Sequence, residues 1–195
     1  MRYPAGHKAI TRERILCAAE RAFGAEGYAG VGVDTLAEQA GITSGAFYGH
    51  FKGKAELFRE AAVVGLGRLR LGMEAFRLKY GRGWAVPFIQ NYLAPPFRQG
   101  LAGGCALPSL SGDVARSTPE TRIAYEAGMR ALFQSLVEGL PGEGVLPRET
   151  RAWAMLALLS GGVTMARAAE SQETGEEIAA AVTAAFNLIS GEPAA

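Results

Sequence analysis

Nucleophiles, metal ligands and long apolar runs are all scarce in this sequence. Its 195 residues include only two cysteines and two histidines. Cys17 and Cys105 cannot form a framework of disulfides, and His7 and His50 do not complete a zinc ligand set with them. No apolar run reaches the roughly 18 residues of a membrane span, and the N-terminus lacks the apolar core of a secretory signal. We therefore expect a cytoplasmic protein with two free thiols, no metal and no membrane contact.

A catalytic site is equally hard to assemble. The segment GGCALPSLSGD offers Cys105, Ser109, Ser111 and Asp113, but it contains no G-x-S-x-G nucleophile elbow. Both histidines lie within the first 50 residues, so no nucleophile has an evident base beside it. We expect neither enzymatic activity nor a cofactor.

Charge is divided unevenly along the chain although the formal net charge is only +1. Residues 1–100 hold 14 Lys and Arg against 8 Asp and Glu, whereas residues 101–195 hold 6 against 11. The two halves therefore carry +6 and −5. A basic N-terminal half favours an anionic partner, and a randomly solvated surface is the alternative.

Apolar residues recur at helical spacing almost throughout, and no segment reads as a strand. The first predicted helix starts after Thr11 and ends near Gly27. A short second helix opens near residues 32–34 and closes at Gly41, which can adopt the left-handed conformation of a helix end. A third begins at Thr43, whose hydroxyl oxygen can accept a hydrogen bond from a backbone N–H group. Two short helices after a longer one have the lengths of a helix-turn-helix unit.

The stretch AGITSGAFYGHFKGK, residues 40–54, contains four glycines yet places Phe47 and Phe51 four residues apart on one helix face. A helix in the DNA major groove benefits from small outward residues because they let its backbone come close. Tyr48 and His50 can donate to phosphate oxygens, and Lys54 adds a positive charge. The predicted DNA-binding residues are Thr43, Ser44, Gly45, Ala46, Tyr48, His50 and Lys54, with Arg2, Lys8 and Arg12 as electrostatic contributors.

Residues 11–58 resemble, without a gap, the DNA-binding domain of the tetracycline-repressor (TetR) family of bacterial transcription regulators. The resemblance rests on the ordered set AA…F…GY, LAEQAGI, SGAFYGHF and K-x-E-L-F. It implies an all-α homodimer, with a helix-turn-helix DNA-binding domain over residues 1–54 and a helical effector-binding and dimerisation domain over residues 55–195. The implied function is a ligand-responsive transcriptional repressor that binds a palindromic double-stranded DNA operator and is released by a small, mostly apolar effector.

Three positions depart from the family pattern. Gly32 stands where Ser or Thr is frequent, Ser44 where Lys or Arg is common, and Gly49 where an aromatic or polar residue is usual. Because these departures remove possible DNA contacts, a helical small-molecule-binding protein with weak or lost DNA binding stays open as an alternative. A thiol-based electrophile sensor is another, since Cys105 lies at an expected helix start. The plain role of Cys105 is that of a small buried hydrophobe.

Beyond residue 61 the resemblance extends only to the general plan. Further helices are expected over about 84–93, near 108–115, from a Ser117-x-x-Glu120 capping box to Gly139, and twice more before the C-terminus. Candidate effector-binding residues are Phe88, Tyr92, Cys105, Tyr125, Met129 and Trp153. Residues on the apolar stripes of the last two helices are candidates for the dimer interface, namely Leu156, Ser160, Thr164, Ile178, Val182 and Phe186.

Overall fold

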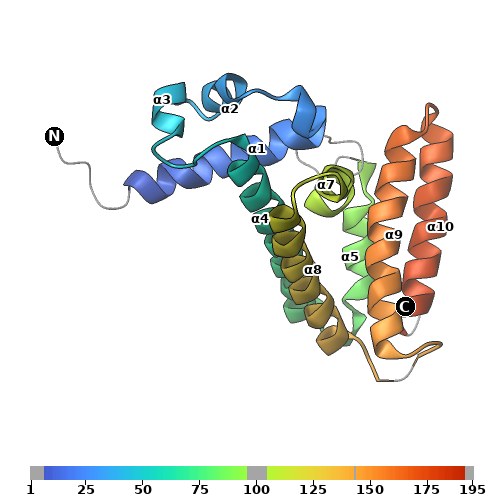
Figure 1. Ribbon diagram of the computed structural model, residues 1–195. Coiled ribbons are helices and arrows are strands. Elements are labelled where there is room, and N and C mark those ends of the chain that lie inside the picture. Colours follow the sequence, from blue (N-terminus) through green and yellow to red (C-terminus); the bar gives the residue numbers. More distant parts are fainter. Residues whose placement is uncertain (1–6, 96–104, 143, 192–195) are drawn as a thin grey trace. The chain divides into compact units, whose positions relative to one another are not determined.

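The computed structural model describes residues 7–95, 105–142 and 144–191. Helices account for most of these residues and none of them is in a strand, so the predicted all-α class is confirmed (Figure 1). The elements in chain order are α1 (His7–Gly30), α2 (Val33–Gln39), α3 (Ser44–Phe47), α4 (Lys54–Tyr80), η1 (Gly81–Gly83), α5 (Ala85–Tyr92), α7 (Ala106–Ala115), α8 (Pro119–Gly139), α9 (Arg148–Ala168) and α10 (Gln172–Ser190).

The described helices form two compact units. The first contains residues up to 65 together with 105–125, and the second contains the described residues of 66–95 and 126–191. Helices α4 and α8 each contribute turns to both units. The first unit thus includes α7 as well as the helix-turn-helix segment. The domain boundary expected after residue 54 divides the chain by function, into a DNA-binding part and an effector-binding and dimerisation part. This division stays a prediction.

Helix α1 differs from its predicted start. It already includes His7, and Thr11 lies buried on its inner face instead of preceding it. The predicted end near Gly27 marks a real break, because Gly27 leaves helical geometry at φ 74° and ψ 170°. The backbone N–H of the next residue, Tyr28, donates to Oδ2 of Asp113 on α7 at 2.7 Å. This bond satisfies an amide at the break and ties α7 to α1.

Helix α7 begins at Ala106, earlier than predicted, and ends at the predicted Ala115. Pro108 lies inside its first turn, where a residue without an N–H group loses no intrahelical hydrogen bond. At the other end, Ser117 donates its hydroxyl to the carbonyl of Val114. The predicted capping box of α8 is therefore wrong by one residue, because Oγ1 of Thr118 accepts from the backbone N–H of Thr121 instead.

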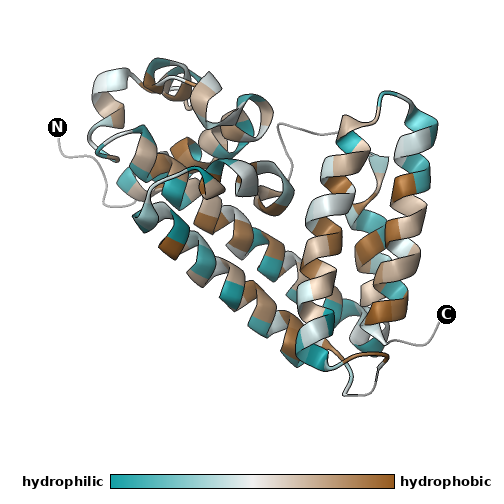
Figure 2. Ribbon diagram, turned by 45° about the vertical axis from the view of Figure 1, so that its right-hand side comes forward, coloured by the Kyte–Doolittle hydropathy of each residue, from teal (hydrophilic) through white to brown (hydrophobic). Residues whose placement is uncertain are grey.

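The second unit is built on an aromatic cluster. Phe88 on α5 is the hub, with ring centroids 5.7 Å from Trp84, 5.6 Å from Tyr92 and 6.2 Å from Phe186 on α10. All four side chains are buried. Helices α9 and α10 lie side by side (Figure 2). Val182 lies close to Gly162, where an added Cβ atom would be 2.8 Å from its side chain. Fully burying rings of this size is among the largest stabilising contributions available to a small unit.

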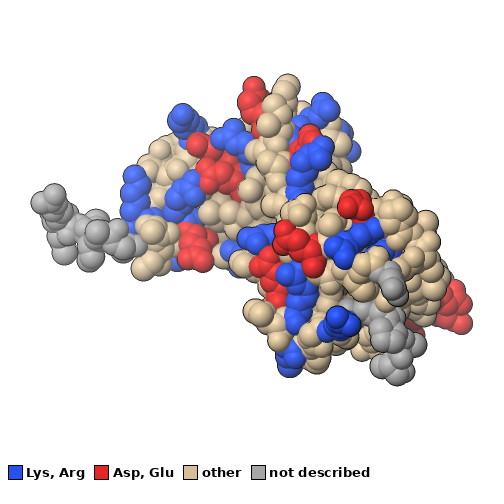
Figure 3. All heavy atoms as spheres, turned by 90° about the horizontal axis from the view of Figure 1, so that it is seen from below, with Lys and Arg blue, Asp and Glu red and all other residues tan. Residues whose placement is uncertain are grey.

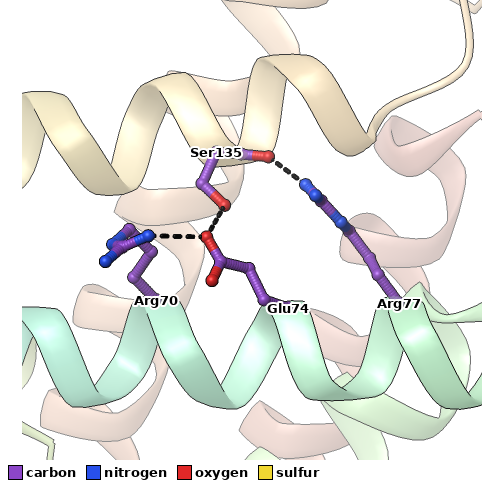
Figure 4. Close-up of polar contacts among 4 residues, drawn as sticks. All are labelled: Arg70, Glu74, Arg77 and Ser135. Atoms are coloured by element: carbon purple, nitrogen blue, oxygen red, sulfur yellow. Dashed lines mark hydrogen bonds and ion pairs between the residues drawn. The ribbon is translucent and has the colours of Figure 1, made fainter.

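Two polar networks fix helices within the second unit. Figure 4 shows Ser135 on α8 donating to Glu74 on α4 at 3.0 Å, while Arg77 donates to the carbonyl of Ser135. The hydrogen bond from Ser135, aided by Arg70, holds the pKa of Glu74 below its usual value. Elsewhere the buried guanidinium of Arg151 donates to the carbonyl of Ser190 at 3.0 Å, at the C-terminal end of α10, where a cation also interacts favourably with the helix dipole.

Gly65 on α4 leaves no room for a side chain beside α7. A Cβ atom at this position would lie 2.4 Å from the Cβ of Ala106, whereas one at Gly67, on the same helix, would meet nothing within 4 Å. We expect Gly65→Ala to lower the free energy of unfolding by about 1–3 kcal/mol through overpacking. The matched change Gly67→Ala should raise it by up to about 1 kcal/mol, because Ala stabilises a helix relative to Gly.

Urea unfolding of both variants, followed by circular dichroism, measures the difference directly. Equal effects of the two substitutions would show that α4 and α7 do not approach this closely.

Candidate DNA-binding surface

The turn between α2 and α3 is fixed by Gly41. Its backbone is left-handed (φ 67°), its N–H donates to the carbonyl of Glu38 at 2.9 Å, and the N–H of Ile42 donates to that of Ala37 at 3.0 Å. Nη2 of Arg14 donates to the carbonyl of Ala40 at 2.8 Å and would lie only 2.7 Å from a Cβ atom at position 41. Glycine is therefore required here both for the backbone conformation and for the passage of Arg14.

Two adjacent hydroxyl groups begin α3. Thr43 is the N-cap, as predicted, and its Oγ1 accepts from the backbone N–H of Ala46 at 3.1 Å. Ser44 uses its hydroxyl differently, donating to Oδ1 of Asp34 in the first turn of α2 at 2.5 Å. Sequence reasoning missed this pair, because residues ten apart on different helices share no local pattern.

The inner face of the α3 segment is aromatic and the outer face is small or polar. Phe47 and Phe51 are buried, with ring centroids 5.9 Å apart, which confirms the predicted inner face. The guanidinium of Arg12 lies over the Phe51 ring at 4.6 Å and also bonds to Glu60. On the outer face Gly45 and Ala46 are exposed, and Tyr48 is 60% exposed. We call the surface formed by Thr43, Ser44, Gly45, Ala46 and Tyr48 the recognition edge.

The side chain of Lys54 is hydrogen-bonded to the protein backbone. Its ammonium donates to the carbonyls of Tyr28 and Val31, each at 2.9 Å, and lies 4.4 Å from the centroid of the Tyr28 ring. The first residue of α4 thus holds the junction between α1 and α2. His50 is half-buried. A phosphate contact by either residue stays a prediction.

The predicted electrostatic contributors differ in their surroundings. The predicted contributor Lys8 is exposed, Arg12 is bonded to Glu60, and Arg2 lies outside the described residues. On the face drawn in Figure 3, which is seen from below the view of Figure 1, Lys and Arg side chains alternate with Asp and Glu instead of forming one basic patch.

The six candidate effector-binding residues are divided between the units. Phe88 and Tyr92 belong to the aromatic cluster of the second unit, Met129 is half-buried, and Trp153 is 38% exposed and stacks on Phe133 with centroids 4.4 Å apart. Cys105 and Tyr125 are buried in the first unit. There the Tyr125 hydroxyl bonds to that of Ser111 at 2.7 Å, and burial raises the pKa of Tyr125 to about 12.

The candidate dimer residues fall into two groups. Leu156 and Phe186 are 3% and 0% exposed, so they belong to the core of the single chain. Ser160 and the exposed Thr164 share a hydrogen bond along α9, while Ile178 and Val182 are half-buried on α10. Within the described part of the chain, no group of His, Cys, Asp and Glu is suited to a metal ion and no helix is long and apolar enough to cross a membrane.

Comparison with known proteins agrees with this geometry. Residues 15–61 match the family model of bacterial regulatory proteins of the TetR family. The HTH-type transcriptional regulator AcrR of Shigella flexneri is 38% identical over 68 residues, which is 33% of this chain and 32% of the relative. TtgR of Pseudomonas putida is 53% identical over 47 residues, or 24% of this chain and 22% of the relative. Each match thus spans a third or less of the relative's own length.

Solved structures resemble the chain over nearly its whole length. A TetR-family regulator from Cytophaga hutchinsonii gives a TM-score of 0.78 at 18% identity, covering 99% of this chain and 100% of that one. The reduced form of Escherichia coli NemR gives 0.74 at 23% identity, covering 89% and 95%. The family model and the sequence relatives show a TetR-type helix-turn-helix DNA-binding domain within residues 15–61. The solved structures show that the whole chain has the fold of TetR-family regulators.

The contacts of Lys54 predict that its removal affects folding. We expect Lys54→Met to lower the free energy of unfolding by about 1–2 kcal/mol, because the carbonyls of Tyr28 and Val31 lose a charged, half-exposed donor. The control Tyr48→Phe removes only an exposed hydroxyl and should leave stability unchanged. Denaturant titrations of both variants test this, and an unaltered midpoint for Lys54→Met would show that its two hydrogen bonds do not stabilise the fold.

Proposed function

We propose that this protein is a ligand-responsive transcriptional repressor that binds a palindromic DNA operator as a homodimer. The observation that carries the proposal is the recognition edge itself. Small and polar groups face outward from α3, while Phe47 and Phe51 anchor it from beneath. A helix of this kind can approach base edges closely without shifting on its support.

The recognition edge also supplies donors for the DNA backbone. Oγ1 of Thr43 accepts from a backbone amide, which leaves its proton free to point outward. The Tyr48 hydroxyl is carried on a side chain that is 60% exposed. Such groups donate to phosphate oxygens and set the register of a protein on the duplex.

The outer faces of α9 and α10 support pairing with a second copy of the chain. Trp153, Ala157, Gly161 and Met165 recur every four residues along α9, and all four are exposed. Ala180, Ala184 and Leu188 do the same along α10. Small residues among larger apolar ones let helices of two copies pack closely, and a twofold axis would present two recognition helices to a palindrome.

The aromatic cluster supports a small, mostly apolar effector. Phe88 and Tyr92 belong to a buried aromatic interior of the second unit, and apolar ligands gain from burial against such rings. Binding there would act on α4 and α8, which are shared with the DNA-binding unit. Release of DNA on effector binding is the response that this arrangement favours.

Selection from a random duplex library by the full chain tests the proposal. We expect the enriched sequences to share one palindrome. Leu188→Glu should convert the dimer to a monomer and weaken binding to that palindrome by about 100-fold, since two linked contacts become one. Ala131→Glu adds the same charge at an exposed position of α8 and should change neither property.

Light scattering gives the oligomeric state and fluorescence anisotropy the affinity. A dimeric wild type that enriches no sequence would contradict the repressor and favour a ligand-binding protein that has lost DNA binding.

A thiol-based sensor is the second candidate, favoured by the position of Cys105. This residue is the N-cap of α7 and is 8% exposed, and the amide groups at a helix start favour an anion. The similar fold of NemR was solved in a form described as reduced. An α,β-unsaturated ketone would add through its β-carbon to the sulfur, while the thiol proton moves to the α-carbon.

Under this mechanism the ketone releases wild-type protein from DNA. Cys105→Ser should still bind the selected operator but keep it after treatment, whereas Cys17→Ser should behave like wild type. Anisotropy with labelled operator, before and after treatment, checks the difference. Retention of DNA by treated wild type, or release by treated Cys105→Ser, leaves only the repressor gated by non-covalent ligand binding.

A further inference from the structure

Asp34 and Ser44 form a hydrogen-bonded pair at the recognition edge. The hydroxyl of Ser44, the first residue of α3, donates to Oδ1 of Asp34 in the first turn of α2 at 2.5 Å. A carboxylate has no proton to give, so the serine must be the donor. The interaction joins the two short helices side chain to side chain, on the exposed surface of the first unit.

This bond fixes what the pair can offer to DNA. The only hydroxyl proton of Ser44 is used by Asp34, so lone pairs alone remain on the serine oxygen. The carboxylate of Asp34 also presents only lone pairs. Thr43 is the opposite case, because its oxygen accepts from Ala46 and its proton stays available. The two adjacent hydroxyl groups at the start of α3 thus differ: Thr43 can still donate a hydrogen bond, whereas Ser44 can only accept one.

The four bases differ in how they would meet a surface made only of acceptors. In the major groove cytosine presents a donor alone, its N4 amino group. Guanine presents two acceptors, thymine an acceptor and a methyl group, and adenine an acceptor beside its amino donor. We propose that the Asp34–Ser44 pair is a specificity determinant that selects cytosine in each half of the operator. The proposal rests on the proposed function, in which α3 enters the major groove.

Asp34 could either read a base through Ser44 or only stabilise the start of α2, and the two roles predict different effects of its removal. A carboxylate near DNA is repelled by phosphates on every sequence alike, so removing it should strengthen nonspecific binding. If Asp34 only stabilises the positive end of the α2 dipole, its removal costs stability and leaves base preference unaltered. If it reads cytosine through Ser44, the preference for cytosine is lost. Nonspecific binding rises in both cases, so the loss of base preference is the result that identifies the reading role.

The experiment compares libraries selected by the full-length wild type, Asp34→Ala, Ser44→Ala and Glu38→Ala. Glu38 is an exposed acid on the same short helix, so its removal matches the charge change without touching Ser44. We expect wild type to require cytosine at one symmetric pair of positions, with about a tenfold or greater loss of affinity for guanine or thymine there. Asp34→Ala and Ser44→Ala should both lose this preference, and Glu38→Ala should keep it.

A second measurement uses the unaltered protein. Replacing the selected cytosine by 2-pyrimidinone removes its amino group, and wild type should lose about the same affinity as on base substitution. Ser44→Ala should show no further loss on that DNA. An operator whose base preferences survive both Asp34→Ala and Ser44→Ala overturns the inference while the repressor stands. Enrichment of no sequence by wild type means that the proposed function itself has failed.

Discussion

The placement of one very short helix depends on burial of its inner face. Helix α3 has only four residues, far below the length at which an isolated helix is stable in water. Its position therefore comes from Phe47 and Phe51, which are almost fully buried, and from a turn that Gly41 and Arg14 leave little freedom. Every contact proposed for the recognition edge presupposes this anchoring, because groups that read bases must be held to within a fraction of an ångström.

Local features of this arrangement could be predicted from the sequence. The cap at Thr43, the left-handed turn at Gly41 and the inward pair Phe47 and Phe51 each follow from residues within four positions of one another. Contacts between residues far apart in the sequence could not be predicted from it. The charge of Lys54 directly after α3 led to the prediction of a phosphate contact, which stays a prediction. Its two backbone acceptors lie 26 and 23 residues earlier and were not predicted. Nothing in a local pattern distinguishes a lysine that meets solvent from one that meets distant carbonyls.

The last two helices show a related limit. Periodicity identified apolar stripes, but the bulkiest members, Leu156 and Phe186, belong to the core of the single chain. The outer faces mix small residues, as at Ala157 and Gly161, with large exposed ones such as Trp153 and Leu188. Residue size therefore does not separate the buried face from the outer one. A pattern of hydrophobicity alone cannot assign stripes to core or interface.

Helix α4 has residues in both compact units and makes specific polar contacts in each of them. Near its start α4 holds the carbonyls of Tyr28 and Val31 through Lys54, and in the second unit the same helix is joined to α8 through Glu74 and Ser135. An α-helix transmits displacement because its backbone bonds resist stretching. Within the first unit, a displacement of the start of α4 would act on the α1–α2 junction, because Lys54 bonds to the carbonyls of Tyr28 and Val31. Such a displacement would reach the recognition edge through α2, because α2 is joined to α3 by the Gly41 turn and by the Asp34–Ser44 hydrogen bond.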